Sequence, residues 1–272
     1  QHRCKLVDSG AWGVFVALCC GVVLLGFIVL HASNVTASLE PVVLASCGVV
    51  TGIGIGGLFV CWVIPLRSIE ASRVMPTVLV AFALAYGFYA AMRLGAAFLP
   101  TIIYPAAVVA CGVLWRACSG RSWTQHENAP LGSSPLLSSL NAIRNPLFCT
   151  SAAVFVVTIT RRISIAGSHD AMGETVNIVG ALSVVRLVLG LLLLKPKMSR
   201  SASSTITGLF CILFPVIATL LIVLSAGQIA VALTVGAISF AIFIVMLALS
   251  IPMCIETARV RQTDALSLYC LF

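Results

Sequence analysis

The sequence predicts an all-α protein that crosses a membrane many times. Of its 272 residues, 60% are apolar and only 9% are charged, whereas a soluble domain carries about 25% charged residues. The apolar residues are gathered into runs of about 20, the length of a membrane-spanning helix. Similar segments also recur in the two halves of the chain. We therefore expect a polytopic integral membrane protein with two parallel six-helix repeats, of which eight complete spans and part of a ninth are present.

The positions of the apolar runs define the expected spans. They cover residues 11–31, 41–64, 74–92, 96–115, 146–165, 175–194, 205–225 and 229–251, and another begins at residue 265. The second run contains Gly48, Gly52 and Gly56, a spacing that lets a neighbouring helix approach closely. Residues 52–57 also match the GxGxxG pattern of dinucleotide-binding proteins, but that pattern needs a strand-to-helix turn. Because the match lies inside one apolar run, we interpret these glycines as a helix-packing surface.

A polar segment divides the chain. Residues 118–145 are rich in Ser, Gly and Pro, a composition typical of a linker. We expect residues 1–117 to be the last four helices of an N-terminal six-helix half, residues 118–145 to be a cytoplasmic linker, and residues 146–272 to belong to the C-terminal half. The chain begins inside a basic segment and ends inside an apolar run, so we also expect a fragment of a longer protein.

Lys and Arg predict the orientation. With the N-terminal segment in the cytoplasm, 12 of the 16 basic residues fall on the cytoplasmic side, three fall on the other side, and Arg186 lies within a span. Such an excess predicts a multi-pass protein of the cell inner (cytoplasmic) membrane, with the N-terminal segment and the central linker in the cytoplasm. The net charge of +8 is therefore interpreted as a topology signal rather than as a nucleic-acid-binding surface.

One segment occurs twice, each time after a long apolar run. Residues 64–74 read IPLRSIEASRV, and residues 251–260 read IPMCIETARV. A weaker similarity joins residues 13–15 to residues 208–210. Both comparisons correspond to six helices, and because six is even the two halves are expected to face the same way.

The expected arrangement resembles the major facilitator superfamily, in which two parallel six-helix halves surround a central cavity and are joined by a long cytoplasmic loop. On that resemblance the visible spans are helices three to ten of twelve, and the family's basic loops fall at residues 1–8 and 195–204. Arg3, Lys5, Lys195, Lys197 and Arg200 occupy these loops. The family's Gly and Asp pattern is not recognisable in residues 195–204, which argues against ordinary transport.

The chain also resembles the membrane regions of LuxR-type regulators, in which a transporter-like region of twelve helices precedes a helix-turn-helix domain. That resemblance implies ligand sensing in the membrane, with DNA bound only through a C-terminal domain outside this chain. The alternative is a secondary transporter of the major facilitator type that moves a small anionic solute. In both cases the expected partners are the lipid bilayer and a small-molecule ligand.

Arginines are the candidate ligand-binding residues. Arg186 lies within a span, Arg93 ends a span that carries two tyrosines, and Arg161 and Arg162 end a span rich in Ser and Thr. In the resembling fold these spans line the cavity. We expect the four arginines to form a basic vestibule for a small anionic molecule. The alternative is that Arg161 and Arg162 pair with Asp170 or Glu174 in the following loop or reach lipid headgroups, and that Arg186 snorkels.

The repeated segment carries a second candidate site. Glu70 with Arg73, and Glu256 with Arg259, are spaced i,i+3 at the expected cytoplasmic ends of two spans. Such pairs are either weak ion pairs on exposed helix ends or a cytoplasmic gate that closes between the two halves.

Catalysis and metal binding are not expected. The four histidines are scattered, no CxxC spacing occurs, and most of the eleven cysteines lie in or beside apolar runs, where they are expected to be small buried apolar side chains. No Asp or Glu lies in the middle of a span, although proton-driven carriers generally use such a carboxylate. We therefore expect a protein that is not an enzyme and needs no cofactor.

Overall fold

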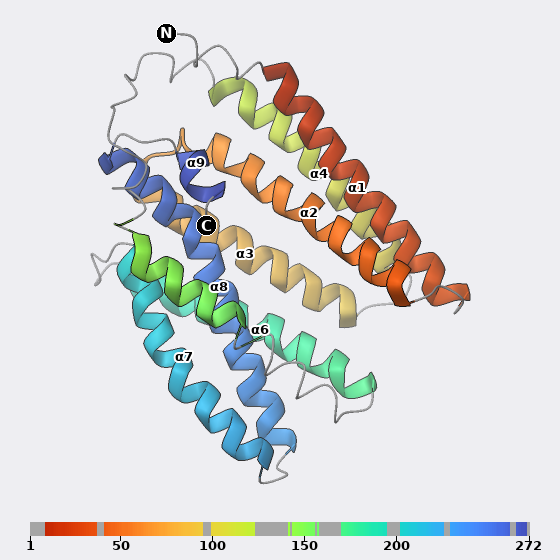
Figure 1. The fold of residues 1–272 in the computed structure, drawn as a ribbon, viewed down its shortest axis with the longest axis vertical. Helices are drawn as coiled ribbons and strands as arrows, with labels where there is room; N and C mark the ends of the chain where they lie inside the picture. Colours follow the sequence, from red (N-terminus) through yellow and green to blue (C-terminus); the bar gives the residue numbers. More distant parts are fainter. Residues whose placement is uncertain are drawn as a thin grey trace. The chain divides into compact units, whose positions relative to one another are not determined.

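In the computed structural model the described part of the chain is helical almost throughout (Figure 1). The structure describes residues 9–36, 41–94, 99–122, 141, 143–155, 157, 170–194, 202–225, 229–261 and 265–270. The helices are α1 (Ser9–Thr36), α2 (Pro41–Leu66), α3 (Ala71–Leu94), α4 (Leu99–Ser122), α6 (Asp170–Leu194), α7 (Ala202–Ser225), α8 (Ile229–Arg261) and α9 (Ala265–Cys270). Residues 143–155 are also helical, and no strand occurs in the described part of the chain. The all-α class is therefore confirmed.

Six of these helices are long and apolar enough to cross a membrane, namely α1, α2, α3, α4, α7 and α8. The apolar stretch that the structure describes in α6 is shorter, Asn177–Leu193. The predicted fifth span, 146–165, lies partly outside the described residues, and α9 has only six residues. The count of nine spans is therefore not confirmed, whereas six candidate spans are present.

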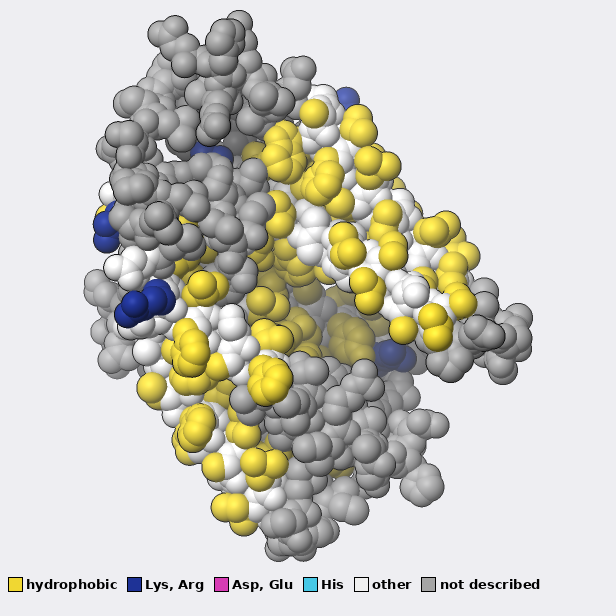
Figure 2. Space-filling view, viewed as in Figure 1, with side chains coloured by type: hydrophobic (Ala, Val, Ile, Leu, Met, Phe, Trp, Pro, Cys, Tyr) yellow, Lys and Arg dark blue, Asp and Glu magenta, His cyan; other side chains and the backbone are white. Residues whose placement is uncertain are grey.

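The surface of the helices is apolar, as expected for contact with lipid. Figure 2 shows apolar side chains over most of the described surface on one face, with few basic side chains. Leu18, Ile53 and Phe214 are each more than 60% exposed. A water-soluble protein rarely exposes so much contiguous apolar surface, so the composition and the surface agree.

The chain forms two compact units. Unit 1 contains residues 1–69 and 98–130, and unit 2 contains residues 70–97 and 131–272. The units do not coincide with the predicted division into residues 1–117, 118–145 and 146–272, because α3 packs against α6 and α8 of unit 2. Residues 123–140, the centre of the predicted linker, lie outside the described part of the chain.

Unit 1 is a three-helix group in which α1, α2 and α4 contact one another. Glycines let α1 and α2 approach closely: a Cβ atom on Gly54 would lie 2.9 Å from Cγ2 of Val23 and 3.2 Å from the carbonyl oxygen of Cys19. Trp115 of α4 is also fully buried there. Small residues permit this backbone approach between apolar helices.

Unit 2 is built around α8, which packs against α3, α6, α7 and α9. About 78% of the most apolar stretch of α8 is buried, and residues such as Ala241, Val245 and Leu249 are almost inaccessible to solvent. A helix that is apolar all round is expected at the centre of a bundle. In Figure 1, α8 runs beside α7 for much of its length.

The two copies of the repeated segment adopt different local structures. After Pro65, α2 ends at Leu66 and a turn follows, whereas α8 continues through Pro252 to Arg261. The first copy is one residue longer, and the hydroxyl of its Ser68 donates to the Pro65 carbonyl at 2.7 Å. The similar sequences therefore do not end their helices in the same way.

Candidate functional site

Arg186 lies in the middle of an apolar stripe on α6. Its side chain is exposed, and the same face of the helix carries exposed Val179, Leu182, Leu189 and Leu193. The spacing of 3, 4, 3 and 4 residues places all five side chains on one face. Among the residues that the structure describes, Arg186 makes no hydrogen bond or ion pair. The opposite side of α6 packs against α3 and α8.

Arg93 lies in the same unit as Arg186 but at a different position along the helix axes. Its guanidinium carbon is 5.6 Å from the ring centroid of Tyr89, a cation–π contact within α3. A Cβ atom on Gly87 of α3 would lie 3.7 Å from Val185 of α6, so the neighbouring Arg186 lies near the level of Gly87. Arg93 is six residues farther along α3, about 9 Å at the helical rise per residue. Arg161 and Arg162 lie outside the described residues.

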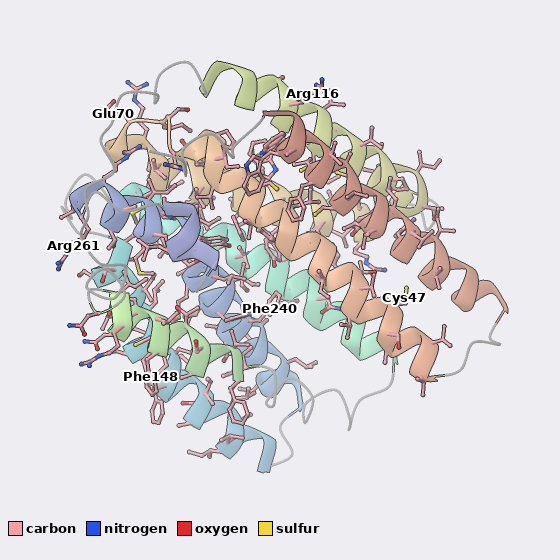
Figure 3. The ribbon with its side chains drawn as sticks, turned by 45° about the horizontal axis from the view of Figure 1, so that its top comes forward. Cys47, Glu70, Arg116, Phe148, Phe240 and Arg261 are labelled. Carbon is pink, nitrogen blue, oxygen red and sulfur yellow. The ribbon has the colours of Figure 1, made fainter. Side chains whose placement is uncertain are left out.

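Aromatic residues fill the region where α3, α6 and α8 meet. Tyr86 and Phe240 make an edge-to-face contact with their ring centroids 6.2 Å apart. A Cβ atom on Gly180 of α6 would lie 3.1 Å from Cδ1 of Phe240, which is labelled in Figure 3. The glycine therefore makes room for the Phe240 ring beside α6. This contact joins α8 to α6, the helix that carries Arg186.

The predicted gate residues all lie in unit 2. Nε of Arg73 is 3.3 Å from Oε2 of Glu70, and both side chains are more than 60% exposed, so this pair contributes little to stability. Glu256 has a different environment: its Oε2 accepts a hydrogen bond of 3.2 Å from the backbone N–H of Ala202, the first residue of α7. A carboxylate at a helix N-terminus interacts favourably with the unpaired amides there. Whether these residues form a gate stays a prediction.

The predicted packing glycines contact no neighbouring helix in the described part of the chain. At positions 48, 52 and 56 no heavy atom of another described helix lies within 4 Å of the place where a Cβ atom would stand. In unit 1, α1 instead packs on the face that carries Gly54 and Gly57. The row Gly48, Gly52 and Gly56 therefore makes no close packing with a described helix of unit 1, and its role as a packing surface stays a prediction.

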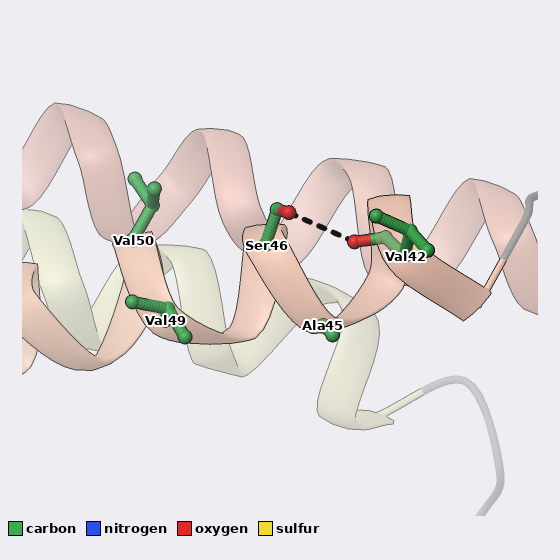
Figure 4. A pocket seen from close by; sticks show the side chains of 5 residues that line it. All are labelled: Val42, Ala45, Ser46, Val49 and Val50. Carbon is green, nitrogen blue, oxygen red and sulfur yellow. Dashed lines mark hydrogen bonds between the residues drawn. The ribbon is translucent and has the colours of Figure 1, made fainter.

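A shallow pocket lies near the start of α2 (Figure 4). It is lined by Val42, Ala45, Ser46, Val49 and Val50, all on one helix. The Ser46 hydroxyl donates to the Val42 carbonyl at 2.8 Å, and none of the lining side chains is charged. The pocket contains none of the arginines predicted to bind a ligand.

Comparisons with known proteins leave the family open. No family model, curated protein or solved structure matches this chain. The resemblances to the major facilitator superfamily and to LuxR-type regulators are therefore predictions from the sequence.

Two tryptophans were missed as candidate residues. Trp115 Nε1 of α4 donates to the Cys61 carbonyl of α2 at 2.8 Å, and Trp62 Nε1 of α2 donates to Cys111 Sγ of α4 at 3.1 Å. One signal in the sequence could have drawn attention to the first bond. Cys61 lies four residues before Pro65, and proline has no amide hydrogen. The Cys61 carbonyl therefore cannot accept the usual helical hydrogen bond from residue 65.

Proposed function

We propose that the chain is the membrane-embedded, transporter-like ligand-sensing domain of a LuxR-type transcriptional regulator, and that Arg186 binds a small anionic ligand. The observation that carries the proposal is an arginine at the centre of an apolar helix face. Placing a charged side chain near the middle of a membrane-spanning helix costs at least about 2.5–3.5 kcal/mol of free energy unless the side chain meets water, a partner or a ligand. Arg186 makes no ion pair within the described part of the chain, so a ligand anion is the partner that we assign to it.

The packing of unit 2 supports a route from this ligand to the rest of the protein. α6 carries Arg186 and packs against α8, where Gly180 receives the ring of Phe240. At its other end α8 carries Glu256, which bonds the first residue of α7. A ligand that moved α6 would therefore act on the central helix of the unit and, through Glu256, on α7.

The proposal has a direct binding test. The chain is reconstituted in lipid nanodiscs, and its thermal unfolding midpoint is measured with a panel of small carboxylates and organic phosphates. We expect an anion that raises the midpoint of the wild-type chain to leave the Arg186→Ala chain unchanged, because the charge and the planar donor fork are both lost. Arg261→Ala is the matched control, since it removes the same charge from an exposed residue at the end of α8. Equal ligand shifts in wild-type and Arg186→Ala chains would refute the proposal.

Transport by the same fold is the alternative function. A central α8 in contact with α3 and α6 suits a transporter half as well as a sensor, and fold does not decide function. Liposomes that contain the chain and are loaded with the anion identified above distinguish the two. Exchange of a labelled anion across the bilayer would favour the transporter, whereas binding without exchange would favour the sensor.

A further inference from the structure

The end of α2 lacks one helical hydrogen bond because of its proline. In an α-helix each amide donates to the carbonyl four residues earlier, so the amide of residue 65 would donate to the carbonyl of Cys61. Proline has no amide hydrogen. Inside an apolar bundle such a gap is costly, because lipid and apolar side chains offer no replacement donor.

In this structure an indole supplies a replacement donor. Trp115 Nε1 of α4 donates to the Cys61 carbonyl at 2.8 Å, a good length for such a bond. The Trp115 side chain is only 2% exposed and Cys61 is 0% exposed, so water does not compete for this carbonyl. The bond joins two helices at the one turn of α2 where the proline removes a bond within the helix.

A second tryptophan makes the reciprocal bond. Trp62 follows Cys61 on α2, and its Nε1 donates to Cys111 Sγ at 3.1 Å, one turn before Trp115 on α4. A thiol sulfur is a weak acceptor, and this bond does not involve the carbonyl opposite Pro65. Trp62 is therefore a natural control for Trp115.

α2 ends close to the link that leads out of unit 1. After Leu66 the backbone continues in tight turns: Ser68 N donates to the Pro65 carbonyl at 3.3 Å, and Ile69 N donates to the Leu66 carbonyl at 3.2 Å. The boundary between the units falls directly after Ile69. The last turn of α2 thus directly precedes the segment that leads out of unit 1.

We propose that Trp115 is a latch at Pro65: its indole N–H replaces the hydrogen bond that the proline removes and thereby fixes the end of α2 and the link that follows. When the latch opens, the last turn of α2 and residues 67–70 become free to reorient. The latch lies wholly in unit 1, and its test needs no ligand.

A double-mutant cycle tests the latch on the full chain in nanodiscs. The four chains are wild type, Trp115→Phe, Pro65→Ala and the double variant, and hydrogen exchange is followed at the amides of residues 66–70. Trp115→Phe removes this donor from the buried carbonyl, so we expect exchange at residues 66–70 to become about tenfold faster. In the Pro65→Ala chain residue 65 regains its amide, so the same substitution should change the exchange rate by less than about twofold.

Phenylalanine also leaves a small cavity, but that cost is shared by both backgrounds and cancels in the cycle. Trp62→Phe is the matched control, and its effect should be the same in the wild-type and Pro65→Ala backgrounds. The latch would be overturned if Trp115→Phe changed the exchange rate by the same factor in the wild-type and Pro65→Ala backgrounds. It would also be overturned if the effect of Trp62→Phe depended on Pro65 as strongly as the effect of Trp115→Phe does.

Expression gives a second measurement if the single variant does not fold. In that case the proposal requires Pro65→Ala to restore accumulation of the Trp115→Phe chain in the membrane. Failure of the double variant to accumulate would also overturn the latch.

Discussion

Replacing Gly54 with alanine tests the packing of α1 on α2. The new Cβ atom would lie 2.9 Å from Cγ2 of Val23, 3.1 Å from Cγ1 of Val22 and 3.2 Å from the carbonyl oxygen of Cys19. The valine side chains can rotate, but the carbonyl oxygen belongs to the backbone of α1. The substitution should therefore displace α1 as a whole.

The size of the effect follows from two opposing terms. Overpacking of a close contact costs about 1–3 kcal/mol, and replacing Gly by Ala inside a helix returns roughly 0.5–1 kcal/mol. We expect Gly54→Ala to lower the free energy of unfolding by about 1–2 kcal/mol. Gly52→Ala is the matched control, because among the described residues no heavy atom of a neighbouring helix lies within 4 Å of its Cβ position. That variant should be neutral or more stable by up to about 1 kcal/mol.

The measurement is unfolding by SDS titration in mixed micelles, followed by circular dichroism, with the oligomeric state determined in parallel by size-exclusion chromatography. Equal unfolding free energies for the two variants would refute the packing that the structure shows. If Gly52→Ala, but not Gly54→Ala, lowered the unfolding free energy and also dissociated an oligomer, the row Gly48, Gly52 and Gly56 would instead be assigned to an interface outside unit 1.

Two further substitutions test unit 2 in the same titration. Glu256→Ala removes the acceptor for the Ala202 amide and should lower the unfolding free energy by about 1 kcal/mol. Glu256→Gln keeps an acceptor and should lose about half as much, so equal stability of all three chains would contradict the assignment. Gly180→Ala places a Cβ atom 3.1 Å from Phe240 and should destabilise by about 1 kcal/mol. Adding Phe240→Leu to the Gly180→Ala chain should restore part of the lost unfolding free energy. If the two substitutions instead lowered the unfolding free energy additively, the contact between Gly180 and Phe240 would be contradicted.

Apolar runs predicted most of the helices because about 20 consecutive apolar residues cannot be accommodated otherwise in a membrane. The expected run 41–64 became α2 (Pro41–Leu66), and the run 205–225 became α7 (Ala202–Ser225). An apolar run does not show where its helix ends. The two copies of the repeat both contain Ile-Pro, yet α2 ends at Leu66 while α8 continues to Arg261.

The sequence could not decide which face of a helix packs. α2 has glycines on two faces, and Val22, Val23 and Cys19 of α1 meet the face of Gly54 rather than that of Gly52. For α6 the sequence placed Arg186 inside an apolar stretch, and the structure describes Asn177–Leu193 as that stretch. Which side of α6 is open is set by its contacts with α3 and α8, which lie far away in the sequence.

The length of α8 gives it a mechanical property. Its 33 residues make a rod of about 50 Å, whereas the hydrocarbon layer of a membrane is about 30 Å thick. A tilt of about 10° would move one tip of such a rod by about 9 Å relative to the other. Because Glu256 lies near that tip and bonds the start of α7, such a tilt of α8 would displace the first turn of α7 as well.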